Sequence, residues 1–183
     1  MPSLYQAALG DLAAVFDRID DAAVDAAVND IAAARRIAFY GCGREGLQVR
    51  GFCMRLYHLG LHVAMVGDMT TFPVGPGDLL VVTAGPGELS TAAALIGVAA
   101  KAGARTLVVT AQPDGSTSRL ADAMLVVPAQ TMADDRGPSV SVLPMGSVME
   151  GALFILFEVM VLKLREKLGA TPEAMRARHT NLE

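Results

Sequence analysis

The sequence contains no tryptophan and only two cysteines, and aromatic residues make up just 5% of the chain. Charged residues are also scarce, at 19%, whereas hydrophobic residues account for 52%. Two cysteines are too few for a disulfide-built scaffold. We expect Cys42 and Cys53 to be small inner residues in a reducing compartment. The apolar composition fits a sheet covered on both faces, with further surface buried between subunits.

Positive charge is not in excess, because the formal net charge is −4 at pH 7. Nucleic acid is therefore not an expected partner. The most apolar run, residues 151–164, is too short for a membrane span and carries Glu158 and Lys163, so no membrane association is expected. The first twenty residues lack the basic segment and unbroken apolar core of a signal peptide, which predicts a cytoplasmic protein.

The stretch 79–91, LLVVTAGPGELST, is the segment around which the chain is organised. Four apolar residues predict a strand buried on both faces, two glycines and a proline break it, and an alanine-rich helix opens at Glu88. A second unit of this kind, IAFYGCGREG, covers residues 37–46. If the two strands are neighbours in a parallel sheet, their glycine turns meet over its carboxyl edge and form a site.

The order of elements predicts an α/β fold with three layers, α-β-α. Helical stretches over 47–59 and 89–102 separate several of the strands, which implies right-handed crossovers and a parallel sheet. Five short strands favour the flavodoxin-like order 2-1-3-4-5, with the first and third strands flanking the switch point. The expected strands are Ile37–Tyr40, His62–Val66, Leu79–Thr83, Thr106–Thr110 and Met124–Val127.

The chain of 183 residues is expected to form one domain over 1–183. Two helices over 3–19 and 22–35 make up its N-terminal segment, residues 1–35, and the sheet core covers 36–128. A polar loop, 130–145, precedes the C-terminal helices and tail of 146–183. The long helix 146–168 is apolar nearly all round, so it must be buried, partly against another copy of the chain.

The first glycine turn, GCGREG, also matches the spacing of a dinucleotide fingerprint, and Asp68 follows at the end of the next strand. That match is weak alone. A second glycine turn with its own helix favours a small anion or sugar held between two turns instead. Such turns also join strands to helices without binding anything, and Glu88 can simply complement a helix dipole.

Glu150 lies in the first turn of the otherwise apolar helix 146–168. Burial without a partner would raise its pKa and suit it to general base catalysis, whereas an exposed carboxylate there would have no such role. His58 and His62 are four residues apart, but Gly60 interrupts the helix, so metal ligation is not expected. His179 lies in a polar tail where histidines are often simply solvated.

Taken together, these residues resemble the sugar isomerase (SIS) domain family and, within it, the 6-phospho-3-hexuloisomerases. The resemblance covers almost the whole chain. It rests on the stretches 41–44 with 54–60, 85–88, 143–147 with Glu150, and the close MRARHTNLE at 175–183. The family interconverts a 3-ketohexose 6-phosphate and fructose 6-phosphate through an enediol.

The resemblance implies a catalytic base at Glu150 and a histidine at His179 that acts in a neighbouring subunit's site, where imidazole suits proton transfer near neutral pH. It implies a homotetramer, or a homodimer, and neither a cofactor nor a metal. The residues expected to contact a sugar or sugar phosphate are Gly41, Gly43, Arg44, Glu45, Ala84, Gly85, Gly87, Glu88, Ser90, Thr91, Met145 and Ser147.

The second turn departs from the family pattern, Ser-Gly-Ser-Gly-Glu-Thr, whose hydroxyls grip phosphate. The three hydroxyl positions are Ala84, Pro86 and Leu89, and the serine usual after Arg44 is Glu45. Proline also removes a backbone donor. A carboxylate about 5 Å from a phosphate, at an effective dielectric near 20, would repel it by several kcal/mol. Ser90 and Thr91 could substitute only if the helix began in a shifted register.

Two functions follow from this mixture. The chain is either a sugar isomerase acting through Glu150 and His179, or a non-catalytic SIS module that binds a sugar and regulates another process. The substrate of the isomerase would be a phosphosugar held differently, or a sugar derivative without phosphate at the usual place. A nucleotide-binding oxidoreductase subunit has little support.

Overall fold

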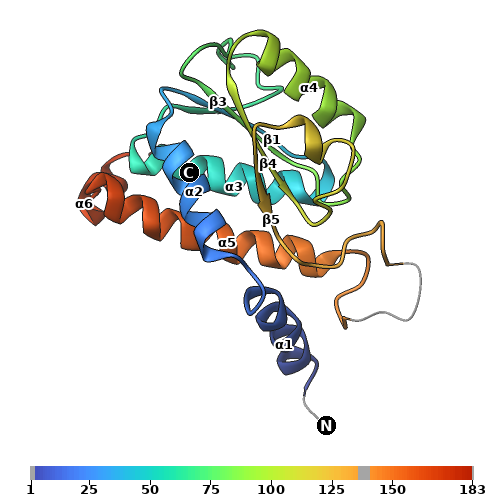
Figure 1. The fold of residues 1–183 in the computed structure, drawn as a ribbon. Helices are drawn as coiled ribbons and strands as arrows, with labels where there is room; N and C mark the ends of the chain where they lie inside the picture. Colours follow the sequence, from blue (N-terminus) through green and yellow to red (C-terminus); the bar gives the residue numbers. More distant parts are fainter. Residues whose placement is uncertain (1–2, 136–140, 183) are drawn as a thin grey trace.

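The computed structural model describes residues 3–135 and 141–182. Its centre is a five-stranded sheet in the order β2-β1-β3-β4-β5, in which every neighbouring pair is parallel. Helices lie on both sides of it, which gives three layers (Figure 1). The predicted α/β fold and strand order are confirmed. The strands are β1 (Ile37–Tyr40), β2 (Val63–Met65), β3 (Leu79–Thr83), β4 (Arg105–Thr110) and β5 (Ala123–Val126).

Strands β1 and β3 are direct neighbours, as the site prediction requires. Ile37 lies opposite Leu79 and Tyr40 opposite Val82, so the two strands end side by side. Their residues are apolar and largely buried, because helices cover both faces of the sheet. The turns that follow the two strands therefore leave the sheet at the same edge.

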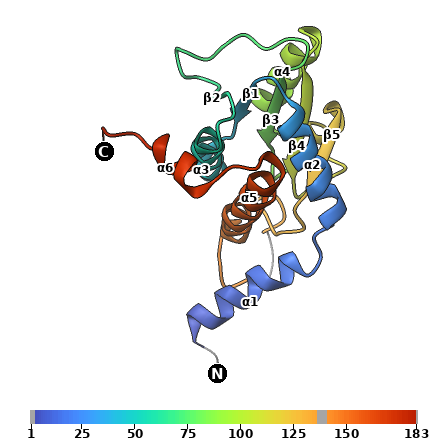
Figure 2. The ribbon, with the colours of Figure 1, turned by 90° about the vertical axis from the view of Figure 1, so that its left-hand side faces the viewer.

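The two faces of the sheet are covered unequally. Helices α2 (Asp21–Ala33), α3 (Gly43–Leu59) and α5 (Ser147–Leu168) share the larger apolar core on one face. Helix α4 (Ser90–Lys101) packs over the other face, through Ala92, Ile96 and Ala99. Helix α1 (Leu4–Phe16) contacts α5 away from the sheet, and α6 (Pro172–Ala177) contacts α3 (Figure 2).

A buried carboxylate fastens the beginnings of β1 and β3 together. Asp78 accepts hydrogen bonds from the guanidinium groups of Arg36 and Arg35, at 2.7 and 3.0 Å, and from the Gly75 N–H at 2.9 Å. These partners, Arg36 first, hold the pKa of Asp78 well below its usual range. Because Asp78 precedes β3 and the arginines precede β1, the cluster stabilises the register of this pair.

Several predicted boundaries are wrong by a few residues. Helix α3 begins at Gly43 rather than at residue 47, so the first glycine turn is shorter than expected. Helix α4 begins at Ser90, which leaves Glu88 outside the helix.

Of the two cysteines, both expected to be inner residues, Cys53 is buried but Cys42 is exposed. In the loop expected over 130–145, residues 136–140, including Gly137 and Pro138, lie outside the described residues.

Helix α5 is buried along much of its length. Nine of its side chains are buried, including Leu153 and Phe157, whose ring stacks on that of Phe52 at a centroid distance of 4.4 Å. In the described part of the chain, no helix meets the length and apolarity that a membrane span needs. The helix is therefore a core element that anchors Glu150 at its N-terminal end.

Truncation of a core side chain in α5 tests this packing. Leu153 is fully buried, so Leu153→Ala should lower the free energy of unfolding by about 3 kcal/mol, through lost burial and a new cavity. Leu120→Ala, at a position 56% exposed, should cost less than about 1 kcal/mol. Urea denaturation of both variants measures the difference, and equal losses would contradict the assigned core.

Candidate active site

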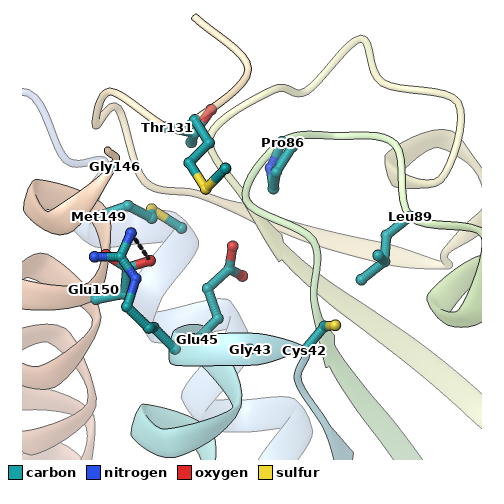
Figure 3. Close-up of a pocket in the computed structure, with 11 residues that line it drawn as sticks. Cys42, Gly43, Glu45, Pro86, Leu89, Thr131, Gly146, Met149 and Glu150 are labelled. Atoms are coloured by element: carbon teal, nitrogen blue, oxygen red, sulfur yellow. Dashed lines mark ion pairs between the residues drawn. The ribbon is translucent and has the colours of Figure 1, made fainter. Parts of the chain in front are cut away.

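A cavity of about 210 Å³ lies where the carboxyl edge of the sheet meets the N-terminal ends of α3 and α5. Figure 3 shows Glu150 on one side of it, the turn bearing Pro86 on the other, and Glu45 between them. Its lining comes from both glycine turns, from α5 and from the segment after β5. The lining residues are Cys42, Gly43, Arg44, Glu45, Pro86, Leu89, Thr131, Met132, Gly146, Met149 and Glu150.

The first glycine turn needs glycine at residues 41 and 46, because the backbone there folds tightly on itself. A Cβ at Gly41 would lie 2.8 Å from the Gly46 Cα, and one at Gly46 would lie 2.5 Å from the Gly41 carbonyl oxygen. Both positions therefore require glycine, whatever the site binds. Asp68, the acid of the dinucleotide alternative, pairs with Arg50 at 3.6 Å and does not line the cavity. The dinucleotide alternative gains no support from this arrangement.

Glu150 lies in the first turn of α5 and reaches the cavity. Its side chain is only 16% exposed, and its Oε1 lies 3.3 Å from an Arg44 nitrogen. Its Oε2 is buried, without a hydrogen-bond partner among the described residues. Burial raises the pKa of Glu150, and Arg44 opposes that rise. A carboxylate with one oxygen uncommitted and a raised pKa is suited to accept a proton from a bound ligand.

Arg44 joins α3 to the beginning of α5. Besides Glu150, it donates hydrogen bonds to the Ser147 hydroxyl at 2.8 Å and to the Met145 carbonyl oxygen. Met145 has a positive φ of 56°, immediately before the helix. Met145 and Ser147, predicted as ligand contacts, thus contact Arg44 and are not among the cavity-lining residues. Their placement fixes the orientation of Arg44 over Glu150.

Glu45 reaches from α3 to the second glycine turn. Its Oε2 accepts a hydrogen bond of 3.1 Å from the Gly85 N–H, and a side chain at residue 85 would collide with its other oxygen. Burial raises the pKa of Glu45, the Gly85 N–H lowers it, and the nearby charge of Glu150 raises it further. Two carboxylates and one guanidinium therefore share the cavity.

The remaining predicted contacts divide into two groups. Gly41, Ala84, Gly85 and Gly87 shape the turns without being among the lining residues, and Ala84 is fully buried. Glu88, Ser90 and Thr91 are exposed and lie outside the cavity lining. The helix begins at Ser90, so no shift of register brings the two hydroxyls into the place of the missing ones.

His179 is far from the cavity of its own chain. It follows α6, where its ring stacks on His58 at a centroid distance of 5.2 Å. His58 is near the C-terminal end of α3, and Arg44 is at the N-terminal end of the same helix. Fourteen residues of helix separate them by about 21 Å. His179 is therefore not among the residues that line the cavity with Glu150 in this chain.

Sequence reasoning missed three further residues that line the cavity. Thr131 and Met132 follow β5, and Met149 precedes Glu150 on α5. The sequence signal for Thr131 and Met132 is that they follow a strand, since parallel strands all end at one edge of the sheet. The signal for Met149 is its position next to Glu150. Within the described residues, no group of three or more His, Cys, Asp and Glu side chains could hold a metal ion.

Comparison with known proteins places the chain in a family. The sequence profile of the SIS domain matches residues 30–156. The chain belongs to the SIS domain family. Over 181 residues it is 36% identical to the 3-hexulose-6-phosphate isomerase of Mycobacterium gastri, covering 99% of this chain and 89% of that protein.

The SIS assignment agrees with two further comparisons. The Bacillus subtilis 3-hexulose-6-phosphate isomerase is 34% identical over 168 residues, which cover 90% of this chain and 89% of that protein. A hypothetical protein from Methanococcus jannaschii, whose crystal structure is described as inferring a 3-hexulose-6-phosphate isomerase function, matches with a TM-score of 0.84. At 23% identity over 98% of both chains, that second likeness shows the SIS fold.

The raised pKa of Glu45 leads to a pH-dependent stability prediction. The pKa of Glu45 is higher in the folded than in the unfolded protein, so the folded protein keeps this proton to a higher pH. The wild type therefore loses stability as the pH rises from the unfolded to the folded pKa of Glu45. Glu45→Gln should therefore raise the melting temperature at pH 7, and its advantage should shrink towards pH 4. Asp114→Asn, at a side chain 96% exposed, is the matched control and should have little effect. A lower melting temperature of Glu45→Gln at pH 7 would contradict the assignment.

Proposed function

We propose that this SIS protein is a sugar or sugar-phosphate isomerase that shifts a carbonyl group between neighbouring carbons through an enediol. The observation that supports it most is the position of Glu150, which lines the cavity and whose buried Oε2 has no hydrogen-bond partner among the described residues. The identity to 3-hexulose-6-phosphate isomerases over most of the chain supports the same reaction class. Interconversion of a 3-ketohexose and fructose, as 6-phosphates or in a related form, is the reaction we propose.

In the proposed reaction, Glu150 removes the proton from the carbon beside the carbonyl, and the carbonyl oxygen takes up a proton to give the enediol. Glu150 then returns the proton to the former carbonyl carbon, while the hydroxyl on the carbon that was first deprotonated loses its proton and becomes the new carbonyl. Arg44, 3.3 Å from Glu150, keeps the carboxylate oriented between the two steps. No net proton is consumed, so one base and one second proton carrier suffice.

We assign the second proton carrier to His179 of a neighbouring subunit, because its own-chain position is at the opposite end of α3. Self-association is supported by exposed apolar side chains on α3 and α5, among them Met54 and Phe154, which line one groove between the helices. A homotetramer, or at least a homodimer, is the assembly we propose.

The two free thiols suit a reducing cytoplasm as the compartment of this protein.

Deuterium exchange tests the base assignment. In deuterium oxide, the wild type should exchange the carbon-bound proton of 3-hexulose 6-phosphate or fructose 6-phosphate, or of the unphosphorylated sugars, as followed by NMR. Glu150→Gln keeps the side-chain size but cannot accept the proton, so exchange should fall at least about 10³-fold. The wild-type rate should also decline as the pH falls towards the raised pKa of Glu150, because protonation disables the base.

Exchange that persists in Glu150→Gln would reject Glu150 as the base. No exchange by the wild type with any of these sugars, together with thermal stabilisation by one of them, would instead favour a sugar-binding regulatory module. Leu120→Ala, whose exposed side chain is outside the site, serves as the control and should exchange at the wild-type rate.

Light scattering after gel filtration tests the assembly. The wild type should elute with a mass that is a multiple of the 19.1 kDa chain. Phe154 is 60% exposed, so Phe154→Glu should spare the fold but place a charge in the proposed interface and release monomers. Turnover should fall with assembly, since His179 would no longer reach the partner's site. A wild-type monomer, or an unchanged mass for Phe154→Glu, would contradict this interface.

A further inference from the structure

The second glycine turn has the geometry of an anion site, but its donor is already used. A turn between a buried strand and a helix can direct backbone N–H groups towards an anion above the sheet. Here the Gly85 N–H donates to the Glu45 carboxylate at 3.1 Å. The protein's own anion therefore occupies the position that a ligand anion would take.

Other amides of the turn are committed within the protein too. The Gly87 N–H donates to the Ala84 carbonyl oxygen at 2.8 Å, and the Leu89 N–H donates to the Thr117 hydroxyl at 2.9 Å. Pro86 has no N–H to offer. Pro86 and Leu89 instead present apolar surface to the cavity. Among the described residues, the N–H groups of Gly85, Gly87 and Leu89 are therefore not free to bind a phosphate.

The balance of charge in the cavity also disfavours a phosphate. Among its lining residues, Arg44 supplies a positive charge, while Glu45 and Glu150 supply two negative ones. The guanidinium lies on the Glu150 side, where it contacts Glu150, Met145 and Ser147. A phosphate at the Gly85 turn would face the Glu45 carboxylate with no cation of the cavity lining beside it.

We propose that Glu45 is the specificity-determining residue of this site, and that it selects a sugar whose end at the Gly85 turn is a hydroxyl group and not a phosphate. A hydroxyl donates a hydrogen bond to a carboxylate, whereas a phosphate dianion repels it. The inference rests on the proposed function in one respect, that the ligand of this cavity is a sugar. Of the two substrate classes left open by the sequence, it selects the sugar without phosphate at the usual place.

Calorimetric titration at pH 8 and constant ionic strength tests the proposal, with fructose 6-phosphate, fructose and inorganic phosphate as probes. The wild type should bind fructose 6-phosphate no more than about threefold more tightly than fructose. Glu45→Ser frees the Gly85 N–H and removes the charge, so it should bind fructose 6-phosphate at least about tenfold more tightly than the wild type. Glu45→Gln, which removes the charge but keeps the bulk, should show a smaller gain, and Asp114→Asn none.

A single substitution at Glu45 does not restore the hydroxyl groups that are missing from the second turn. A second pair of variants therefore tests the effect of Glu45 with those hydroxyls present. The triple variant Ala84→Ser, Pro86→Ser, Leu89→Thr is compared with the quadruple variant that also carries Glu45→Ser. A tenfold gain on removing Glu45 in either background supports the proposal. No gain in either background, or a wild type that binds fructose 6-phosphate more than tenfold more tightly than fructose, overturns it. Because the readout is binding, the result stands whether or not the protein exchanges deuterium.

Discussion

The pairing of β1 with β3 is the constraint on which the site depends. Their register places Tyr40 beside Val82, so the chain leaves both strands at the same edge and both glycine turns begin there. The Asp78 cluster with Arg35 and Arg36 fixes the other end of the same pair. Had either strand been placed at the margin of the sheet, Glu45 could not reach Gly85 and no shared cavity would form.

Helix α5 contributes the Glu150 carboxylate to the cavity between the two glycine turns. Its buried face anchors it beside α3, and its N-terminal turn then directs Glu150 at the space between the turns. Arg44 joins the two helices at that point, through Glu150, Ser147 and Met145. Burial raises the pKa of Glu150, while Arg44 keeps its carboxylate in place. The same packing that stabilises the fold therefore positions the carboxylate that we propose as the base.

The sequence predicted the sheet well, because buried parallel strands are short apolar runs bounded by glycine and proline. It placed β1 and β3 correctly and singled out Glu150 on an apolar helix, while leaving open whether its carboxylate is buried. It placed Glu88 in a helix because a carboxylate after a glycine turn suits a helix N-terminus, yet the Leu89 N–H is held by the Thr117 hydroxyl and the helix begins at Ser90. That contact joins residues 28 apart, which local patterns do not reveal.

The contact between Glu45 and Gly85 joins residues 40 apart, and the sequence suggested only that a carboxylate would lie near this turn. The most direct test of the proposed site is a crystal structure of the protein with a bound sugar. We expect the ligand between the two glycine turns, with its reacting carbons within reach of the Glu150 Oε2 and a hydroxyl on Glu45. A sugar bound elsewhere, or a cavity from which Glu150 points away, would contradict this expectation.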